Sequence, residues 1–375
     1  MKFIAKKEEL SKVLNNVVKI IPSKGNDNTL PYLKIDLTSD GLFFTGTNGE
    51  ISIISKMPIV LDDTQIIRDI VNGSTLVNAN LFNEIVKRID GDELSFELID
   101  QSIAKIQNET SDFKLNALNP DEYRDLDFSK KGIKLTLLSK NFIEAINQVA
   151  FAVSVKENNR RSLTGINIQN IPSKIIFTAT DGARLARKEL YMDILESINI
   201  TIPAKWVLEV IRTIQTENAI DIYLNENKAL FCLNNTLISI NLIADSFPNT
   251  KNIIPKNFFY TLTVNSNELI NAIDRVSLFA PDDRANIVKL TMNSGGVSLS
   301  SVSPTNGSGV ETIKSFNFIG ERLEISFNGE FVKNAIRALT TEEVCMNFLG
   351  EMKPFTITNP SDESVIQLIT PVRTY

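Results

Sequence analysis

Apolar residues recur along the chain in a unit that occurs three times: a short apolar run followed by apolar positions spaced three and four apart. The three copies lie at residues 3–18, 135–150 and 262–277, and they align without gaps. A short apolar run is typical of a strand, and a spacing of three and four residues is typical of an amphipathic helix. Each copy therefore predicts a strand that ends at Lys or Ser and leads into a helix.

A second strand and helix pattern lies inside each interval, at residues 75–86, 200–211 and 324–335. Repeats with periods of about 20–50 residues form solenoids, whereas the period here exceeds a hundred residues. The sequence therefore predicts three duplicated domains, each built from two similar halves. We expect their ranges to be 1–128, 129–255 and 256–375, with proline-containing linkers at residues 119–132 and 244–257.

Between the helices, alternating or continuous apolar runs such as residues 33–37, 42–46 and 51–56 are separated by Asp-Gly and Asn-Gly turn signals. Such runs predict hairpin-connected strands. A β-α-β-β-β unit used twice in each domain gives an α+β fold. Its six helices are expected at residues 6–19, 81–88, 139–150, 203–213, 266–277 and 330–340, and Pro203 is tolerated in a first turn.

Composition removes several classes of chemistry. The chain has no histidine, so His-based triads and His-ligated zinc sites are excluded. Cys232 and Cys345 each lie in an apolar run, which favours two reduced core thiols in a reducing cytoplasm. The first residues are charged by position six and no later run approaches about 18 uncharged apolar residues, so we expect an intracellular protein without cofactor or metal.

The net charge of −6 argues against nucleic acid, but its distribution changes the picture. The six predicted helices sum to +4, which leaves −10 for the rest of the chain. If equivalent helices share one side, that side is mildly basic, and it could hold phosphates weakly and in a salt-dependent way. The alternative is an ordinary solvated helix face. Candidate phosphate contacts are Lys12, Lys87, Arg88, Lys205, Arg212, Lys333 and Arg337.

Six short motifs occur in the order and spacing of a known family. They are MKF at residues 1–3, TLP at 29–31, TDGARLA at 180–186, FPNTKNIIP at 247–255, FNGEF at 327–331 and ITPVR at 369–373. Over essentially its whole length the chain resembles the bacterial DNA polymerase III β subunit, the DNA sliding clamp. The TDG-x-RLA motif is the most specific of the six.

The resemblance implies a homodimeric ring around double-stranded DNA, with helices inside and sheets outside, that slides without reading sequence. Retention by topology needs no tight phosphate contact, which agrees with the weak positive charge. The first domain of one subunit meets the third domain of the other, and two such contacts close the ring. By the family's pattern these surfaces include Phe113 and Leu115 in the first domain and Leu278 and Phe279 in the third.

The resemblance also implies an apolar groove between the second and third domains that receives short peptides from the replicative polymerase, the clamp loader and repair polymerases. Apolar walls hold the hydrophobic anchors of a peptide, and Arg184, Arg373 and Asn328 bind its polar groups. By matching motif the lining is Leu163, Thr180, Gly182, Arg184, Leu185, Pro248, Ile253, Asn328, Phe331, Met352, Pro354, Leu368, Ile369, Pro371, Val372 and Arg373.

The chain departs from the family's pattern at several positions. Ala285 and Asn252 replace an aromatic residue and an arginine near the groove, so the preferred peptide can differ. The acidic run expected after Ser303-Pro304 is replaced by TNGSGVE, with only Glu311 nearby, so we expect apolar contact rather than salt bridges at the dimer interface. The basic residue expected before TLP is absent. The cations that could contact DNA in its place are Lys24, Arg160 and Arg161.

Two other functions are compatible with parts of the sequence. The adjacent carboxylates at Asp62-Asp63 and Asp282-Asp283 could suggest an enzyme, but both pairs lie in loop-like sequence, and no phosphate-binding glycine loop or nucleophile motif is present. We therefore expect no catalytic residues. An interaction scaffold that uses the groove but forms no ring is the second alternative, and it predicts a monomer without preference for circular DNA.

Overall fold

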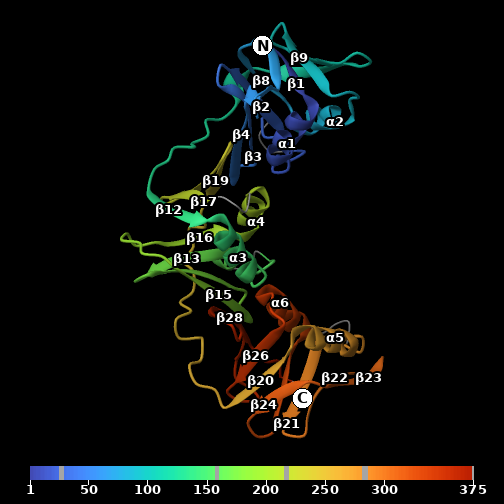
Figure 1. Ribbon diagram of the computed structural model, residues 1–375, viewed down its shortest axis with the longest axis vertical. Helices are drawn as coiled ribbons and strands as arrows, with labels where there is room; N and C mark the ends of the chain where they lie inside the picture. The colour runs from blue at the N-terminus through green and yellow to red at the C-terminus, as the bar shows by residue number, and fades with distance from the viewer. Residues whose placement is uncertain (25–28, 157–159, 215–218, 281–285, 374–375) are drawn as a thin grey trace. The chain divides into compact units, whose positions relative to one another are not determined.

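A computed structural model describes residues 1–24, 29–156, 160–214, 219–280 and 286–373. It divides into two compact units. Unit 1 comprises residues 1–139 and 212–242, and unit 2 comprises residues 140–211 and 243–375. Both units are built from antiparallel sheets covered by helices (Figure 1). The units divide the middle repeat between them, so the predicted domain boundaries near residues 128 and 255 stay a prediction.

Unit 1 contains a 13-stranded sheet in the order β12-β17-β18-β19-β4-β3-β2-β8-β11-β10-β9-β1-β7, and a two-stranded hairpin of β5 and β6. Its helices are α1 (Lys7–Val18) and α2 (Ala79–Arg88), with a short 3-10 turn at Pro120–Glu122. Its strands are β1 (Lys2–Lys6), β2 (Tyr32–Thr38), β3 (Gly41–Thr47), β4 (Ile51–Met57), β5 (Val60–Leu61), β6 (Thr64–Gln65), β7 (Ile67–Val71), β8 (Gly73–Asn78), β9 (Glu93–Ile99), β10 (Ile103–Gln107), β11 (Asp112–Leu118), β12 (Ile133–Leu138), β17 (Ala219–Leu224), β18 (Lys228–Leu233) and β19 (Thr236–Asn241).

Unit 2 contains a nine-stranded sheet in the order β16-β13-β14-β15-β28-β27-β26-β20-β24, and a four-stranded sheet in the order β23-β22-β21-β25. Its helices are α3 (Ser139–Ala150), α4 (Ala204–Thr213), α5 (Ser266–Ser277) and α6 (Gly329–Leu339), with a 3-10 turn at Arg161–Thr164. Its strands are β13 (Gly165–Ile171), β14 (Lys174–Thr180), β15 (Arg184–Tyr191), β16 (Asn199–Pro203), β20 (Tyr260–Asn265), β21 (Ile287–Asn293), β22 (Gly296–Ser303), β23 (Gly307–Ile313), β24 (Phe316–Ile319), β25 (Leu323–Asn328), β26 (Glu343–Phe348), β27 (Phe355–Asn359) and β28 (Asp362–Ile369).

The strand and helix repeat predicted from the apolar pattern is confirmed. β1, β12 and β20 lead directly into α1, α3 and α5, and β8, β16 and β25 lead into α2, α4 and α6. Several helix boundaries differ from the predicted ones by one or two residues: α1 is Lys7–Val18, α2 begins at Ala79, and α6 is Gly329–Leu339. Pro203 is the last residue of β16, so α4 begins one residue later than predicted. An extended backbone suits proline, whose φ is fixed and which donates no hydrogen bond.

The two halves of a repeat exchange strands. β1 pairs with β9 of the second half, and β8 of the second half pairs with β2 of the first. Consecutive repeats are joined in the same way, by β19 on β4 in unit 1 and by β28 on β15 in unit 2. Backbone hydrogen bonds therefore continue from one repeat to the next. The strand register at each of these junctions determines which side chains meet there.

The helices pack on the sheets through their apolar faces. α1 lies against α2, and α5 lies against α6, on one side of their strands (Figure 1). In the third repeat the core is centred on Phe355, whose ring lies 5.1 Å from the ring of Phe348 and 5.7 Å from that of Phe327. All three are fully buried. Among the described residues no helix is both long and apolar enough to cross a membrane.

Candidate functional site

The TDGARLA motif forms the turn between β14 and β15 and the first residues of β15. The Asp181 carboxylate accepts hydrogen bonds from the backbone N–H groups of Ala183 and Arg184, at 2.9 and 3.0 Å. Gly182 has a φ of +94°, a conformation that favours glycine, and its N–H donates to the Thr180 hydroxyl at 3.1 Å. The motif therefore fixes the point at which β15 and the Arg184 side chain begin.

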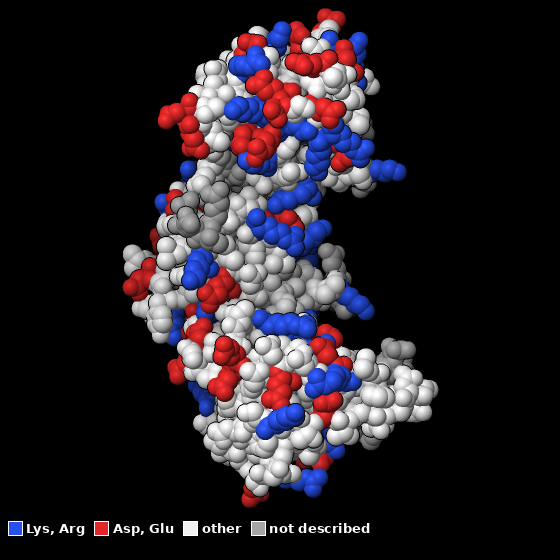
Figure 2. Space-filling view, turned by 45° about the vertical axis from the view of Figure 1, so that its right-hand side comes forward, with Lys and Arg blue, Asp and Glu red and all other residues white. Residues whose placement is uncertain are grey.

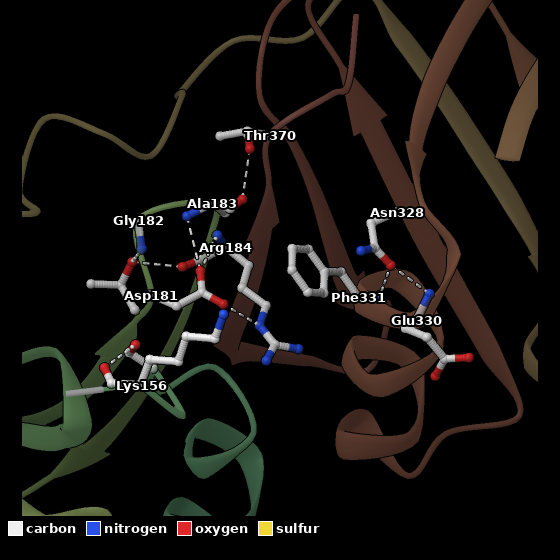
Figure 3. A network of polar contacts seen from close by, with 11 residues as sticks. Lys156, Asp181, Gly182, Ala183, Arg184, Asn328, Glu330, Phe331 and Thr370 are labelled. Atoms are coloured by element: carbon white, nitrogen blue, oxygen red, sulfur yellow. Dashed lines mark hydrogen bonds and ion pairs between the residues drawn. The ribbon is translucent and has the colours of Figure 1, made fainter. Parts of the chain in front are cut away.

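Arg184 is buried, with only 9% of the residue exposed, and its side chain is in contact with other groups on three sides. Its Nε donates to the Asp181 carboxylate at 2.9 Å. Its guanidinium lies 4.3 Å from the centre of the Phe331 ring (Figure 3). On another side, the centre of the Phe151 ring lies 5.4 Å away. We call Phe151, Asp181, Arg184 and Phe331 the Arg184 cluster. The Nη1 atom of Arg184 is buried and has no hydrogen-bond partner within the described residues.

β28 pairs with β15, the strand that begins at Arg184. The chain that leaves β28 is hydrogen-bonded to the segments on both of its sides. The Thr370 N–H and hydroxyl both donate to the Ala183 carbonyl, at 2.9 and 2.7 Å. Two residues later, the Val372 N–H donates to the Ser326 carbonyl at 2.7 Å. The ITPVR segment is therefore held between β15 and β25.

Asn328 contributes as a helix cap. Its side-chain oxygen accepts from the N–H groups of Glu330 and Phe331 at 2.9 and 3.3 Å, which satisfies two free donors at the start of α6 (Figure 3). The cap fixes the first turn of α6 and with it the Phe331 ring that lies on Arg184. Asn328 itself is 9% exposed.

The 16 predicted groove residues differ in how accessible they are. Leu185, Leu368 and Ile369 are at most 2% exposed and belong to the sheet core, because side chains on both faces of these parts of β15 and β28 are buried. We therefore remove these three from the residues expected to touch a peptide. Thr180, Arg184 and Asn328 are also buried, Leu163, Pro248, Phe331, Pro354, Pro371 and Val372 are half-buried, and Gly182, Ile253, Met352 and Arg373 are exposed.

The predicted dimer residues of the first repeat lie on β11, whose residues 112–116 pair with β10. On its other side β11 pairs with β8 only at Ala117 and Leu118, so the backbone of residues 112–116 pairs with no other described strand along that edge. Phe113 is 39% exposed there, whereas Leu115 is only 6% exposed. Leu115 is therefore a core residue, because its side chain alternates with that of its exposed neighbours on the strand.

The predicted dimer residues of the third repeat lie near a second free edge. β23 is the last strand of the four-stranded sheet. Leu278 is 76% exposed at the end of α5, and the Phe279 ring packs on Gly309 of β23, where an added Cβ would lie 2.5 Å from that ring. Glu311 forms an ion pair with Arg275 of the same chain at 2.9 Å, so the nearest acid is already neutralised.

The predicted DNA-facing cations are mostly exposed, with one exception. Lys333 has a side chain only 7% exposed that forms ion pairs with Asp274 and Glu330, so the prediction that it faces DNA is wrong. Burial lowers the pKa of Lys333, but the hydrogen bonds to these two carboxylates outweigh it and raise the pKa overall. The remaining predicted cations are exposed: Lys12, Lys24, Lys87, Arg88, Arg160, Arg161, Lys205, Arg212 and Arg337.

Carboxylates accompany some of these exposed cations. Lys12 forms ion pairs with Glu8 and Glu9 at 2.8 and 2.7 Å, and Arg88 forms one with Glu84 at 2.7 Å. The hydrogen bond to Glu8, followed by that to Glu9, raises the pKa of Lys12. The face in Figure 2 likewise shows Lys and Arg interspersed with Asp and Glu rather than gathered in one patch. Such a surface can hold phosphates only weakly.

Comparison with known proteins covers the whole chain. Three domain models of the DNA polymerase III beta subunit match it in succession: the N-terminal domain at residues 1–127, the central domain at 136–249 and the C-terminal domain at 251–373. The beta sliding clamp of Bacillus subtilis (strain 168) is 35% identical over 379 residues, and that of Staphylococcus aureus (strain N315) is 33% identical over 377, with all of each chain covered. The chain belongs to the DNA polymerase III beta subunit family.

Solved structures agree with this assignment. The crystal structure of the DNA polymerase sliding clamp from Bacillus subtilis has a TM-score of 0.95 at 34% identity, and that of the DNA polymerase III beta chain from Streptococcus pneumoniae TIGR4 has 0.94 at 30%. Both alignments cover all of both chains. The predicted family and α+β clamp fold are confirmed. As a beta subunit, the protein is a non-catalytic processivity factor of DNA replication.

The duplicated architecture of a beta subunit contains the Arg184 turn a second time, at residues 47–51. There Asn48 accepts from two N–H groups at 2.9 and 3.0 Å, and Gly49 has the same φ of +94°. The position of Arg184 is taken by Ile51, which is fully buried. The backbone geometry is therefore a property of the repeat, whereas the cation distinguishes the copy in the middle repeat.

Of the two acidic pairs considered for an enzyme, the structure describes only Asp62-Asp63. Asp62 and Asp63 form the exposed turn between β5 and β6, both with positive φ, and Asp282-Asp283 and Ala285 lie outside the described residues. Within the described ranges no group of three or more acidic or cysteine side chains could hold a metal ion.

Three contributors to the site were missing from the predicted lining. Asp181 orients Arg184, Phe151 covers one side of it, and Thr370 fixes the chain after β28. Asp181 stands inside the quoted TDG motif, so the sequence carried its signal. Phe151 directly follows the repeated helix of residues 139–150. The sequence pattern is that of an apolar residue at the end of a helix, and it does not indicate a contact with Arg184.

Proposed function

We propose that two copies of this beta subunit close into a ring around double-stranded DNA through the free edges of β11 and β23. The observation that carries this proposal is the exposure of large apolar side chains beside two sheet edges that pair with no other described strand. β11 offers residues 112–116 with the exposed Phe113, and β23 offers its outer edge with Leu278 nearby. Two unlike edges joined twice give a closed ring.

The proposed interface depends on backbone pairing and apolar contact. Phe113 and Leu278 are large and exposed, and burying such a side chain contributes about 1.5–3 kcal/mol. The nearest acid on β23, Glu311, is paired with Arg275 of its own chain. We therefore expect an interface whose strength changes little with salt concentration, because screening weakens only charged contacts.

We further propose that the exposed cations of the helices touch the phosphates of the enclosed DNA loosely. The proposed contacts are Lys12, Lys24, Lys87, Arg88, Arg160, Arg161, Lys205, Arg212 and Arg337. Because carboxylates neighbour Lys12 and Arg88, their grip on phosphate is weak. A ring retained by topology can then slide along the duplex. We place this activity in the bacterial cytoplasm, where the free thiols of Cys232 and Cys345 stay reduced.

We propose that the Arg184 cluster and the accessible groove residues around it bind short peptides of the replicative polymerase, the clamp loader and repair polymerases. Support comes from a buried arginine between two rings, whose Nη1 donor has no partner among the described residues, and from the exposure of the predicted lining residues Ile253 and Met352. The residues proposed to line this site are Leu163, Thr180, Gly182, Arg184, Pro248, Ile253, Asn328, Phe331, Met352, Pro354, Pro371, Val372 and Arg373.

The ring is tested by its topology. The protein is loaded on nicked circular plasmid by a bacterial clamp loader with ATP, isolated by gel filtration, and assayed again after the plasmid is linearised. A ring stays on the circle and is lost from the ends of the linear form. Equal loss from both forms, with a control clamp loaded successfully in parallel, would instead favour an interaction scaffold that forms no ring.

A further inference from the structure

The least satisfied donor of the Arg184 cluster is the Nη1 atom of Arg184 itself. The residue is 9% exposed, and Nη1 has no hydrogen-bond partner within the described residues. A buried donor on a charged group is costly when it is left without an acceptor. Since Asp181 already neutralises the guanidinium through Nε, a second carboxylate would leave excess negative charge in a buried place. The missing acceptor is therefore best an uncharged carbonyl oxygen.

Phe151 is the residue that follows α3, and the centre of its ring lies 5.4 Å from the Arg184 guanidinium. Glu144 and Gln148 are four residues apart on one face of α3, and Phe151 follows three residues after Gln148, directly after the last residue of the helix. The Gln148 carbonyl accepts from the Gln367 side chain of β28 at 2.9 Å, and Gln367 is fully buried. This bond ties the last turn of α3 to the strand that lies next to Arg184.

A second tie lies one turn farther from Arg184. Lys188 of β15 is 4% exposed, and its Nζ lies 3.3 Å from the Glu144 carboxylate of α3 and 2.9 Å from the Asp362 carboxylate of β28. We call Glu144, Gln148, Lys188, Asp362 and Gln367 the seam. The seam joins α3, β15 and β28 through the Gln367 hydrogen bond and the Lys188 ion pairs. These contacts fix the end of α3 and therefore the position of Phe151, which follows it.

Register explains why the seam ends at Arg184. In the pairing of β15 with β28, Lys188 lies opposite Val365, Ala186 opposite Gln367 and Arg184 opposite Ile369. Residues 184, 186 and 188 share one face of the strand, because side chains alternate. This face of the sheet therefore carries, in order, the ion-paired Lys188, the side-chain amide of Gln367 opposite Ala186, and the Arg184 guanidinium, which lies near the Phe151 ring.

We infer that Phe151, fixed by the seam, is a positioning residue that holds Arg184 against Phe331 so that Nη1 receives a main-chain carbonyl oxygen of the bound peptide. The inference rests on the proposed peptide-binding function of the Arg184 cluster. Two rings that hold one guanidinium limit its rotation, and pre-organisation of this kind lowers the entropy lost on binding. Phe151 thus acts through Arg184 and need not touch the peptide.

The test compares the peptide affinity of full-length variants. The probe is a fluorescein-labelled synthetic peptide from the C-terminal tail of the replicative polymerase, titrated by fluorescence polarisation. Phe151→Leu keeps an apolar side chain but removes the ring, and it should weaken binding about tenfold. Phe151→Tyr should restore the wild-type affinity, since it keeps the ring. Phe259→Leu is the matched control, because Phe259 lies in the same unit with 72% of its surface exposed.

A double-mutant cycle separates positioning from a general structural effect. In an Arg184→Met background, Phe151→Leu should weaken the remaining binding no further, because there is no guanidinium left to hold. A purely structural role would lower affinity by the same factor in both backgrounds. A series of probe peptides, each with one main-chain amide replaced by an alkene, should contain one member that loses affinity for wild type but not for Arg184→Met.

The outcomes distinguish this inference from the proposed function. If the wild-type protein does not bind the polymerase peptide at all, the proposed peptide site is wrong. If wild type binds, Arg184→Met weakens binding, and Phe151→Leu matches wild type, the positioning role is overturned while the peptide site stands. Equal losses in both backgrounds of the cycle would also overturn the positioning role. If no alkene peptide in the series discriminates between wild type and Arg184→Met, the inference that Nη1 receives a peptide carbonyl is overturned.

Discussion

Replacing Lys188 by methionine tests whether the seam holds unit 2 together. Methionine keeps most of the length and apolar volume of lysine but removes the ammonium group. The substitution leaves the carboxylates of Glu144 and Asp362 without the cation that lies 3.3 and 2.9 Å from them. Lys188 itself is almost fully buried, so water cannot take its place there.

The magnitude follows from the exposure of the three groups. Breaking a fully buried ion pair by removing one partner costs about 3–5 kcal/mol. The two carboxylates, however, have side chains 44% and 30% exposed, so water hydrates them in part after the substitution. We expect a loss of about 2 kcal/mol in the free energy of unfolding, which for a unit of this size lowers Tm by about 4–8 °C.

The effect should depend on pH. Burial raises the pKa of Asp362, but hydrogen bonds from Ser364 and Lys188 outweigh it, so the pKa lies below its ordinary value. A carboxylate whose pKa is lowered by folding stabilises the protein above its unfolded pKa of about 3.9, and this contribution is lost as the pH falls through the folded value. The difference in Tm between wild type and Lys188→Met should therefore be largest near neutral pH and shrink below about pH 4.

Differential scanning calorimetry and hydrogen exchange of α3 and β28 provide the measurement. Lys174→Met is the matched control, since Lys174 pairs with Glu189 in the same sheet but has a side chain 32% exposed. It should cost no more than about 1 kcal/mol. Adding Asp362→Asn should recover part of the stability lost in Lys188→Met. A Lys188→Met protein no less stable than the Lys174→Met control would refute the seam as an energetic contact.

Three further predictions concern binding. Arg184→Ala should weaken the polymerase peptide at least tenfold by fluorescence polarisation while the ring stays on circular DNA, and unchanged affinity would exclude Arg184 from the site. Phe113→Ala should shift the dimer toward monomer in sedimentation without loss of Tm, and a variant that stays dimeric would refute the β11 interface. Leu115→Ala should instead lower Tm, because removing the buried leucine side chain opens a cavity. Arg337→Gln should reduce the salt slope of binding to short duplex DNA by about one, whereas Lys333→Gln should leave the slope unchanged and lower Tm.

The local pattern of the sequence determined the secondary structure and its repetition. Helix ranges such as 139–150 and 266–277 match the structure because amphipathic spacing depends only on near neighbours in the chain. The Asp-Gly turn before Arg184 was equally readable, since Asp181 satisfies backbone donors two and three residues away. The motifs quoted for the family were sufficient to assign it.

Tertiary structure alone decided which polar groups are buried and which rings meet them. Lys333 reads as a surface cation, but it faces Asp274 of a different helix because α5 and α6 pack together. The motif placed Leu368 and Ile369 in the groove lining, but both faces of β28 are covered at these two neighbouring residues, so both are buried in the core. Phe151 meets Arg184 because β28, which begins more than two hundred residues later, pairs with β15 and ties α3 beside it. Such contacts depend on strand register between distant segments, and a local pattern carries no information about that register.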